Sequence, residues 1–317
     1  MTRVDPIKLG TRGSPLAMAQ AHEVRDLLIS QHPELAAPGL IKIVKIKTTG
    51  DAVQDRALSD IGGKGLFSKE IDVAQLDCRI DIAVHSMKDL ETHLTAGIGL
   101  VAVLEREDVR DAFISNKVKS LAELPAGSVV GTSSLRRQAQ ILHKRPDLKV
   151  CLFRGNVQTR LRKLSEGVAD ATLLALAGLN RLGKSELVTE ILAPEFILPA
   201  VAQGAIGITC REGDAAMREL VLTLNHAPTM VRVTAERGLL NALDGSCRTP
   251  VGGLADFLTN GGLRLRALVA KEDGSRVYVT ERIGSVSDAD AMGRDAGEEL
   301  RHRAGPDIFL NNQVTEK

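Results

Sequence analysis

The sequence predicts an α/β protein made of two similar domains, followed by a smaller α+β domain at the C-terminal end. Short apolar runs alternate with helical patterns through residues 7–183, which is typical of βαβ units and a mostly parallel sheet. The pattern starts again after residues 124–127, which predicts a second domain of the same kind. Residues 231–317 instead combine a helical pattern with strands of alternating polarity.

The first domain is expected to open with a strand, a turn and a helix. Ser14 precedes Pro15, and this pair is typical of a helix start, because a serine hydroxyl can cap free N–H groups and proline fits the first helical position. A polar loop over residues 86–89 follows the third apolar run. The strands expected in this domain cover residues 7–10, 41–47 and 80–85.

The second domain repeats this arrangement. A turn at residues 132–134 is expected to lead into a helix over residues 135–144. The turns of the two domains share a weak Gly-Thr…Ser pattern that begins at Gly10 and at Gly131. Because ligands of α/β sheets bind at the carboxyl ends of the strands, we expect a ligand cleft between the domains. The strands expected here cover residues 128–131, 149–153 and 170–175.

The third domain is expected to be small. A helix over residues 231–242 is followed by a segment rich in Gly and Pro, residues 243–253. Two alternating strands come next, and Asp273-Gly274 between them suits a tight hairpin turn. They cover residues 263–270 and 276–283.

The charge balance argues against a general nucleic-acid or membrane-surface binder. The chain has 41 Lys and Arg residues against 40 Asp and Glu residues, so its formal net charge is +1. Aromatic residues make up only 2%, which argues against base stacking on single-stranded nucleic acid. No apolar stretch is long enough to span a membrane. We expect neither nucleic acid nor a membrane as a partner, and any anion site must be a local cluster of basic side chains.

The cysteines indicate a reducing compartment. They form no C-x-x-C pair, so we expect no structural zinc, no redox pair and no metal. The first ten residues contain no apolar run of signal-peptide length, and the two features together predict a cytoplasmic protein. Cys247 stands in a polar loop beside Arg248, where positive charge favours the thiolate, although no histidine partner is evident. The remaining cysteines are expected to be buried: Cys78, Cys151 and Cys210.

Six arginines lie at predicted turns between strands and helices. Free N–H groups at a helix N-terminus favour anions, and arginine adds bidentate recognition of a carboxylate or phosphate. The alternative is that each arginine pairs with a neighbouring acid on the surface, as single arginines commonly do. The six are Arg12, Arg136, Arg137, Arg154, Arg160 and Arg181.

Two further loops carry candidate functional residues. The glycine-rich segment over residues 62–67 contains Lys64 and Phe67, and it fits either a lid over the cleft or a plain connecting loop. It is not a P-loop, because the G-x-x-x-x-G-K-[ST] order is missing, so a nucleotide-dependent enzyme is not supported. Asp89, after the third strand, is placed for acid–base work or for stabilising a cation, and the alternative is that it caps a short turn.

Several segments spread along the chain resemble, in the same order, segments of the porphobilinogen deaminase family. Members of this family are also called hydroxymethylbilane synthases. The similarity runs from about residue 7 to residue 255, and several matching segments are long and unusual. The matching segments are Thr11-Arg12-x-Ser14-Pro15-Leu16-Ala17, Gly63-Lys64-Gly65-Leu66-Phe67, Asp81-Ile82-Ala83-Val84-His85-Ser86-Met87-Lys88-Asp89, Gly131-Thr132-Ser133-Ser134-Leu135-Arg136-Arg137-Gln138, Arg154-Gly155-Asn156-x-x-Thr159-Arg160, Ala177-Gly178-Leu179-x-Arg181-Leu182, Leu198-Pro199-Ala200-x-x-Gln203-Gly204 and Gly245-x-Cys247.

The resemblance implies three domains. The first two are similar to the lobes of type II periplasmic binding proteins, with a cleft between them, and the chain returns to the first lobe after Gln203. The implied boundaries are residues 1–108 and 202–222 for domain 1, 109–201 for domain 2, and 223–317 for an α+β domain 3 that carries the cofactor cysteine.

The implied activity is that of a transferase in tetrapyrrole biosynthesis. Four porphobilinogen molecules are joined head to tail into hydroxymethylbilane, with release of four ammonia molecules. The primer is a covalently bound dipyrromethane cofactor, and Cys247 matches the cysteine that holds it through a thioether. The family also implies a monomer, and a downstream enzyme that cyclises the product.

The resemblance assigns roles to individual residues. Asp89 matches the catalytic aspartate, and Lys88 either binds a carboxylate or helps to protonate the leaving amine. Asp60 departs from the family, since many relatives carry a basic residue there, so no carboxylate contact is expected from it. Cofactor binding is implied for Cys247, Ser86, Lys88, Asp89, Thr132, Ser134, Arg136, Arg137, Arg154, Gly155 and Asn156. Substrate binding is implied for Arg12, Ser14, Gln20, Lys64, Phe67, Arg154, Arg160, Arg181 and Gln203.

The implied chemistry also explains on physical grounds why several basic residues would gather at the binding site. Each porphobilinogen carries two carboxylates, and exposed ion pairs contribute only about 0–1 kcal/mol each, whereas hydrogen bonds to charged groups contribute about 1.5–3 kcal/mol. A carboxylate near the pyrrole N–H groups also stabilises the cation that forms when ammonia leaves. The alternative from another class is a non-catalytic pair of lobes for a polycarboxylate, which has no use for Cys247 and usually carries an export signal.

Overall fold

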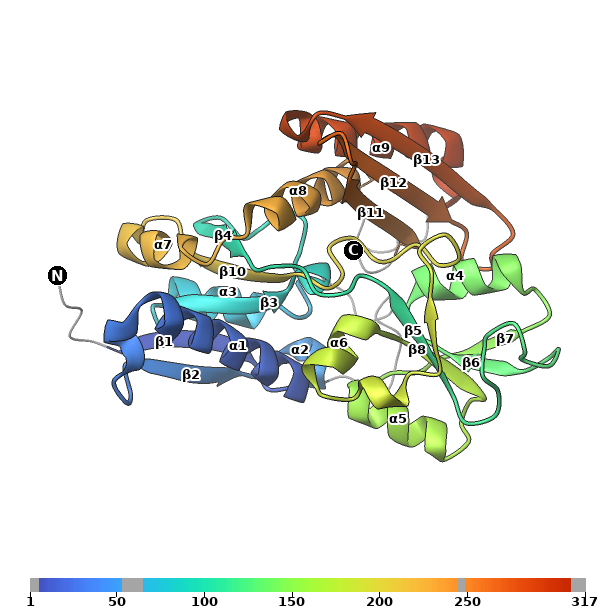
Figure 1. The fold of residues 1–317 in the computed structure, drawn as a ribbon, viewed down its shortest axis with the longest axis horizontal. Coiled ribbons are helices and arrows are strands. Elements are labelled where there is room, and N and C mark those ends of the chain that lie inside the picture. The colour runs from blue at the N-terminus through green and yellow to red at the C-terminus, as the bar shows by residue number, and fades with distance from the viewer. Residues whose placement is uncertain (1–5, 53–64, 244–248, 309–317) are drawn as a thin grey trace, which may run out of the picture. The chain divides into compact units, whose positions relative to one another are not determined.

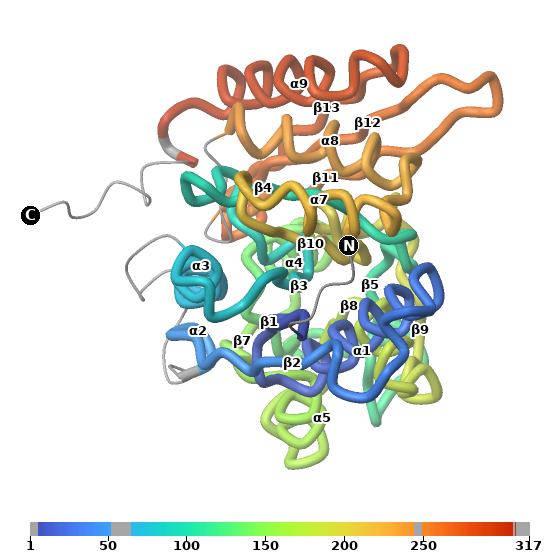
Figure 2. The backbone as a smooth tube through the Cα atoms, turned by 90° about the vertical axis from the view of Figure 1, so that its left-hand side faces the viewer, coloured from blue at the N-terminus to red at the C-terminus, as the bar shows by residue number. Residues whose placement is uncertain are grey.

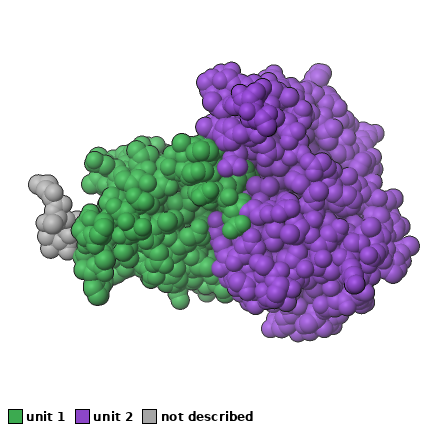
Figure 3. All heavy atoms as spheres, in the orientation of Figure 1, with its two compact units in different colours: residues 1–54, 63–107, 204–230 green, residues 55–62, 108–203, 231–317 purple. Residues whose placement is uncertain are grey.

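The computed structural model describes residues 6–52, 65–243 and 249–308. The chain forms two compact units, which have different colours in Figure 3. Of the described residues, unit 1 contains 6–52, 65–107 and 204–230, and unit 2 contains 108–203, 231–243 and 249–308. Unit 1 is therefore assembled from segments that are far apart in the sequence.

Unit 1 is built on a five-stranded sheet (Figure 1). Its strands are β1 (Ile7–Arg12), β2 (Ile41–Ile46), β3 (Ile82–Ser86), β4 (Ile98–Val103) and β10 (Ile206–Arg211). Their order across the sheet is β2-β1-β3-β10-β4. β1 pairs in parallel with β2 and β3, whereas β10 pairs antiparallel with both β3 and β4. The resemblance implies that the chain returns to the first lobe after Gln203, and the structure places the returning strand between β3 and β4.

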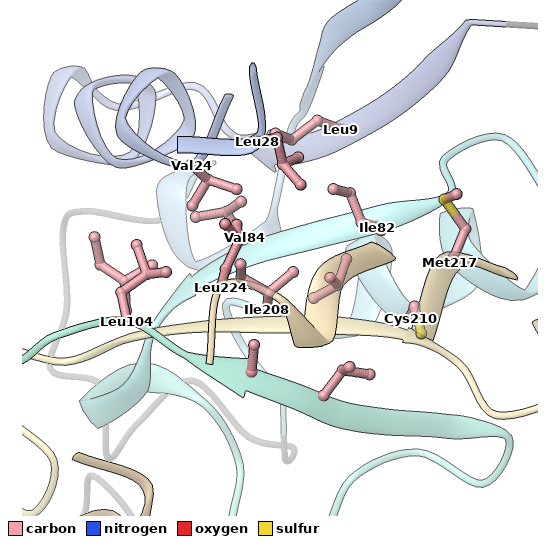
Figure 4. Packing of buried hydrophobic residues seen from close by; sticks show 14 of the residues in the cluster. Leu9, Val24, Leu28, Ile82, Val84, Leu104, Ile208, Cys210, Met217 and Leu224 are labelled. Atoms are coloured by element: carbon pink, nitrogen blue, oxygen red, sulfur yellow. The ribbon is translucent and has the colours of Figure 1, made fainter. Parts of the chain in front are cut away.

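Helices with one apolar face cover this sheet. Val24 and Leu28 of α1 (Pro15–Gln31) share a buried cluster with Leu9 of β1 and Val84 of β3 (Figure 4). Met217 of α7 (Ala215–Leu222) joins the same cluster. The remaining helices that begin in this unit are α2 (Thr49–Ala52), α3 (Lys69–Leu76) and α8 (Ala227–Ala242).

Unit 2 contains a second five-stranded sheet. Its strands are β5 (Asp111–Ser115), β6 (Val129–Gly131), β7 (Lys149–Cys151), β8 (Ala171–Ala175) and β9 (Glu190–Leu192). The order is β7-β6-β8-β5-β9, with parallel pairs on both sides of β6 and antiparallel pairs on both sides of β5. The helices that follow these strands are α4 (Leu135–Lys144), α5 (Val157–Ser165) and α6 (Leu176–Arg181).

The two sheets have the same topology. In each, the fourth strand across the sheet runs against its neighbours, and it is the first strand after the chain has changed units: β10 in unit 1 and β5 in unit 2. The repeat expected from the Gly-Thr…Ser pattern is confirmed. The other four strands of each sheet point the same way, but the antiparallel pairing was not expected, because buried parallel and antiparallel strands have the same apolar pattern.

The C-terminal part of unit 2 is α+β, as expected. An antiparallel sheet of β11 (Val251–Phe257), β12 (Leu263–Ala270) and β13 (Val277–Gly284) packs against α9 (Ala289–Ala304). Figure 2 shows α8 and α9 running beside each other. This close approach requires glycine, since a Cβ on Gly293 of α9 would lie 2.1 Å from the Ala235 carbonyl oxygen of α8.

The expected hairpin turn fixes the small sheet to the second α/β lobe. Gly274 has φ +73°, a value that favours glycine, so the Asp-Gly turn forms as expected. Its carbonyl oxygen accepts a hydrogen bond from Nδ1 of His143 on α4, at 3.0 Å. Gln138, one helical turn earlier, donates to the carbonyl of Glu272 at 3.2 Å. Two hydrogen bonds therefore join α4 to the turn between β12 and β13 within unit 2.

Some expectations fail in the structure. Cys78 is exposed and Cys151 is half-buried, so of the three cysteines expected in the core only Cys210 is buried. Cys78 lies in the turn after α3 with φ +57°, which takes its side chain off the buried face of that helix. The strand β11 begins inside the Gly- and Pro-rich segment, where no strand was expected. Its first residues are small but buried. No helix among the described residues is both long and apolar enough to cross a membrane.

Candidate functional site

The candidate site of unit 1 lies at the carboxyl ends of β1 and β3. Arg12 is the last residue of β1, and the Ser14 hydroxyl then caps α1 by accepting a hydrogen bond from the Ala17 N–H at 3.2 Å. β3 ends at Ser86, and a single turn of 3₁₀ helix, Met87–Asp89, follows. Because β1 and β3 pair in parallel, the two ends meet at one edge of the sheet.

The Arg12 guanidinium contacts two carboxylates. Its Nε and Nη2 donate to the two oxygens of Asp51, at 3.1 and 2.5 Å. Its Nη1 lies 3.6 Å from Oδ2 of Asp89, which is too long for a hydrogen bond but close enough for attraction between the charges. Arg12 thus links Asp51, which belongs to α2, to the candidate catalytic aspartate.

An aromatic ring covers the same guanidinium. The Arg12 guanidinium carbon lies 4.1 Å from the centre of the Phe67 ring, a favourable cation–π distance. Two contacts place this ring. A Cβ on Gly50 would lie 2.3 Å from it, so glycine at this position lets the ring pack on α2. Glu91 accepts a hydrogen bond from the Gly65 N–H at 2.7 Å, which ties the chain before Phe67 to the segment after Asp89.

The ion pair changes both pKa values. Burial lowers the pKa of Arg12, but the hydrogen bond to Asp51 and the charges of Asp89 and Asp51 outweigh it, so the net shift is upward. Burial likewise raises the pKa of Asp51, but the hydrogen bond and charge of Arg12 and the hydroxyl of Thr48 bring it below its usual value. The Arg12–Asp51 pair is therefore fully charged near neutral pH.

Gln20 and Ser86 meet across the edge of the site. The Gln20 amide nitrogen lies 2.9 Å and its oxygen 3.1 Å from the Ser86 hydroxyl, and Gln20 is buried. This contact connects α1 to the end of β3. Lys88 and Asp89 are both half-buried on the turn that follows.

A buried histidine supports the end of β3. His85 lies 3.1 Å from the Thr209 hydroxyl, and that hydroxyl donates to Gln75 at 3.0 Å. Since the hydroxyl proton is used on Gln75, Nε2 of His85 must carry a proton and donate to Thr209. Burial, followed by the positive charge of Arg12, lowers the pKa of His85 to about 4. His85 is thus a neutral member of a buried polar network directly before the site.

In unit 2, two helix N-termini carry the expected polar turns. The Ser134 hydroxyl accepts from the Arg137 N–H at 3.4 Å, and the Thr132 hydroxyl accepts from the Ser134 N–H at 3.2 Å. Asn156 caps α5 by accepting from the Thr159 N–H at 2.9 Å. Ser134 therefore caps α4 as Ser14 caps α1, whereas the Thr11 hydroxyl differs from that of Thr132 in donating to the Ala17 carbonyl at 3.2 Å.

Arg136 and Arg137 point into unit 2, where they surround one buried carboxylate. Oδ2 of Asp111 accepts from Arg136 Nη2 at 2.8 Å and from Arg137 Nε at 3.2 Å, and Oδ1 accepts from Arg137 Nη2 at 2.7 Å. Gln203 also donates to Oδ1, at 2.8 Å. Burial raises the pKa of Asp111, but the charges of the two arginines outweigh it and hold the pKa far below the usual range.

The same arginines fix the backbone around them. Arg137 Nη1 donates to the Leu173 carbonyl of β8 at 2.8 Å, and Arg136 Nη1 donates to the Leu198 carbonyl at 2.7 Å. The four residues of this cluster, Asp111, Arg136, Arg137 and Gln203, are all buried. The N–H donors of Arg137 and the amide of Gln203 therefore form hydrogen bonds inside unit 2. Direct contact of Arg136, Arg137 and Gln203 with a ligand remains a prediction.

The remaining basic candidates lie on or beside α5 and α6. Arg160 Nε donates to the Gly155 carbonyl at 2.9 Å, and Gly155 has φ +119°, which favours glycine. Lys163 donates to the Arg154 carbonyl at 3.1 Å, and Arg154 itself is buried. Arg181 is the last residue of α6 and is half-buried.

Three positions singled out in the sequence fall outside the described residues: Lys64, Cys247 and Asp60. Two carboxylates at the centres of the ion clusters were missed. Asp51 follows the strand beside β1, so the rule that parallel strands end at one edge could have found it. Asp111 opens a buried strand and has no such signal, because an acid at the start of an apolar run reads as a turn residue.

Comparisons with known proteins agree on one family. Residues 7–219 match the family described as "Porphobilinogen deaminase, dipyromethane cofactor binding domain", and residues 230–302 match "Porphobilinogen deaminase, C-terminal domain". The chloroplastic porphobilinogen deaminase of Pisum sativum is 60% identical over 306 residues, which is 96% of this chain and 83% of the relative. The porphobilinogen deaminase of Paracoccus denitrificans is 54% identical over 305 residues, 96% of each chain.

Among solved structures, the fold is similar to that of a periplasmic substrate-binding protein of an ABC transporter from Coxiella burnetii. The TM-score is 0.43 at 14% sequence identity, and the match covers 71% of this chain and 94% of that one.

Proposed function

Since this chain belongs to the porphobilinogen deaminase family, we propose that the side chains at the carboxyl ends of β1 and β3 carry out its chemistry. The chain is a transferase of tetrapyrrole biosynthesis that polymerises porphobilinogen into hydroxymethylbilane. The observation that carries the proposal is the placement of Asp89 beside Arg12 and Phe67, which puts a carboxylate, a cation and an aromatic ring in one half-buried cluster.

Asp89 stabilises positive charge in this proposal. When the amine leaves porphobilinogen, positive charge develops on the pyrrole ring and its N–H, and an ionised carboxylate in contact with that N–H lowers the barrier. The short turn Met87–Asp89 is fixed by the Met87 N–H, which donates to the Ala205 carbonyl at 3.0 Å. Asp89 therefore needs little reorganisation during the reaction. Lys88, on the same turn, binds a substrate carboxylate or helps to protonate the leaving amine.

Arg12 binds a substrate carboxylate in this proposal, with the Ser14 hydroxyl and the amide of Gln20 beside it. Arginine presents two parallel N–H donors to a carboxylate, and a part-buried site makes that contact stronger than at an open surface. One face of the guanidinium is covered by Phe67, so a ligand carboxylate would approach the N–H edge, where Asp51 is bound. In unit 2, Arg154, Arg160 and Arg181 would hold further carboxylates of the growing chain.

The residues of unit 2 fit a cofactor that carries four carboxylates. Thr132, Ser134 and Asn156 surround the N-termini of two helices, where unpaired N–H groups favour anions. Nε of Arg136 is buried and has no hydrogen-bond partner among the described residues, which leaves one donor there for an acceptor. The dipyrromethane, when bound, supplies the pyrrole carbon to which the first substrate is joined. Cys247 would hold it by a thioether, together with Ser86 and the turn around Asp89.

The test of the catalytic role is Asp89→Asn. We expect kcat to fall by about 100- to 1000-fold, the effect of removing one preorganised charge-stabilising group, while the protein still folds. Asp77→Asn is the matched control, because Asp77 is an exposed acid paired with Arg79 at 3.6 Å in the same unit. A near-normal kcat for Asp89→Asn would remove Asp89 from the mechanism.

The test of the cofactor anchor is the intact mass of the purified protein. Wild type should be heavier than the sequence by two linked pyrrole units, and Cys247→Ala should have the mass of the bare chain. An unmodified and inactive wild type, even after incubation with porphobilinogen, would contradict the anchor and favour a protein that only binds polycarboxylates.

We further propose that the protein acts as a monomer in the cytoplasm and passes its product to an enzyme that closes the ring. The balanced charge and the absence of a long apolar stretch support a freely diffusing protein. Light scattering during size-exclusion chromatography checks the first point, since a monomer has a mass of 33.9 kDa.

A further inference from the structure

We infer that Asp51 is an internal competitor, which occupies the carboxylate-binding edge of Arg12 and is displaced when a substrate carboxylate binds. The inference rests on the proposed function, in that Arg12 is taken to bind that carboxylate. It gives Asp51 a role in the site. Asp51 would affect both the affinity for ligands and the choice among them.

The geometry of the Arg12–Asp51 contact is the first argument. Nε and one N–H of Nη2 meet the two oxygens of Asp51 side by side, at 3.1 and 2.5 Å. This is the paired arrangement by which arginine recognises a free carboxylate. A ligand that approaches this edge must therefore share or take the place that Asp51 holds.

The charge count is the second argument. Arg12 contributes one positive charge, and Asp51 and Asp89 already contribute two negative charges next to it. Among the described side chains in contact with Arg12, a ligand carboxylate would be a third anion and would be repelled by Asp51 and Asp89 in a part-buried site. This repulsion favours binding in which one of the two aspartates moves away.

Displacement at this edge concerns Asp51. Asp51 accepts both hydrogen bonds of the Nε and Nη2 edge, whereas Asp89 lies beside Nη1 at 3.6 Å without a hydrogen bond to Arg12. The Asp51 side chain is 28% exposed, so its carboxylate can be solvated when it leaves Arg12. The Thr48 hydroxyl, which donates to Oδ2 at 2.8 Å, is a second partner of Asp51.

The competition also selects among ligands. An ionised carboxylate replaces another at similar strength, whereas an ester, an amide or a chloride ion is a weaker acceptor for arginine and leaves Asp51 in place. Asp51 would thus reserve Arg12 for pyrroles that carry a free acid. The cost is that part of the binding energy of every true substrate is used to displace Asp51.

The experiment compares Asp51→Asn with wild type and with Asp77→Asn, an acid-to-amide change at an exposed ion pair. If Asp51 competes, its removal lowers KM for porphobilinogen by roughly two- to fivefold, the range of a part-exposed ion pair. kcat should stay the same, because Asp51 is already displaced in the enzyme–substrate complex. If Asp51 instead only holds Arg12 in place, KM rises, and the inference is overturned. An unchanged KM overturns it as well.

Arg12→Gln separates this inference from the proposed function. In the Arg12→Gln background, adding Asp51→Asn should leave KM unchanged, since nothing remains to compete for. If Arg12→Gln alone does not raise KM, the proposed substrate contact fails first. If Arg12→Gln raises KM but Asp51→Asn does not lower it, only the competitor role fails.

A second readout does not depend on turnover. In wild type labelled with ¹⁵N, the Nε–H signal of Arg12, assigned by its loss in Arg12→Gln, should shift on Asp51→Asn, and porphobilinogen should shift it at a lower concentration in the variant. Circular dichroism must show that the variant is folded, and Asp51→Ser serves as a second replacement. If both replacements unfold the protein, Asp51 is a structural anchor and the inference is wrong.

Discussion

The two α/β sheets share their topology but use their arginines in different ways. In unit 1, Arg12 pairs with Asp51 at a place where both side chains are about one quarter exposed. In unit 2, Arg136 and Arg137 pair with Asp111, whose side chain is completely buried. The same kind of ion pair is part-exposed in one unit and buried in the other.

The position of the arginine relative to the helix cap explains the difference. Arg12 comes before its cap, Ser14, and so lies at the carboxyl end of β1, where its side chain is part-exposed. Arg136 and Arg137 come after their cap, Ser134, and lie on the buried face of α4. A shift of a few residues within the same strand–turn–helix unit thus converts a part-exposed arginine into a buried one.

The strand partners differ in the same way. Asp111 lies opposite Ala175 in the β5–β8 pair, and Ile206 lies opposite Ser86 in the corresponding β10–β3 pair. Unit 1 therefore has a buried isoleucine where unit 2 has a buried carboxylate. The charged cluster is an addition specific to unit 2, and its Arg136, with Gln140, holds the backbone at Leu198.

The largest expected effect comes from removing the charge of Asp111 from its buried cluster with Arg136 and Arg137. Asp111→Asn leaves two buried arginines without their common carboxylate, and we expect the free energy of unfolding to fall by about 3–5 kcal/mol. Urea denaturation followed by circular dichroism measures this. Asp51→Asn is the matched change in unit 1, and it should cost no more than about 1 kcal/mol. Equal losses for the two variants would contradict the distinction between the units.

The next largest effect is the pH dependence of stability that His85 causes. Leu174 of β8 occupies the corresponding position in unit 2. Its pKa in the folded protein is about 4, against 6.5 when unfolded, so the unfolded chain binds more protons between these values. The free energy of unfolding therefore falls by about 3 kcal/mol as the pH falls from 6.5 to 4. Below pH 4, His85 causes no further loss.

His85→Gln tests this pH dependence. The amide can still donate to the Thr209 hydroxyl but does not titrate, so the variant should lose the part of the acid sensitivity that lies between pH 6.5 and 4. Thermal melts at half-unit pH steps, compared with wild type, give the difference. An identical pH profile in both proteins would mean that His85 is already charged or is not buried.

The smallest effect compares the two serine caps. Ser14→Ala and Ser134→Ala each remove one acceptor for a helix N–H, and each should lower the free energy of unfolding by about 1 kcal/mol. Ser134 should cost less, because its hydrogen bond is longer, 3.4 Å against 3.2 Å. Chemical denaturation of the single and double variants measures both losses. Losses that are zero would show that water satisfies the first turns equally well.

The sequence predicts the repeated strand–turn–helix units well, because local signals define them. Ser14 caps α1 and residues 135–144 form α4, as the Ser-Pro and Ser-Leu patterns indicate. The motifs bring Arg12 and Asp89 together, since both follow parallel strands. Long-range features are missed. The antiparallel β5 and β10 depend on where the chain changes units, and so does Asp111 of β5, whose carboxylate pairs with the arginines of α4. No local pattern records this.

The central position of β10 has a consequence for how the protein is made. β10 lies between β3 and β4, so the sheet of unit 1 stays open along two strand edges until residue 211 has left the ribosome. All five strands of the second lobe are synthesised before that point. Unpaired strand edges are sites of aggregation, so the first lobe is the part of the nascent chain that most needs a chaperone, although its first residues emerge earliest.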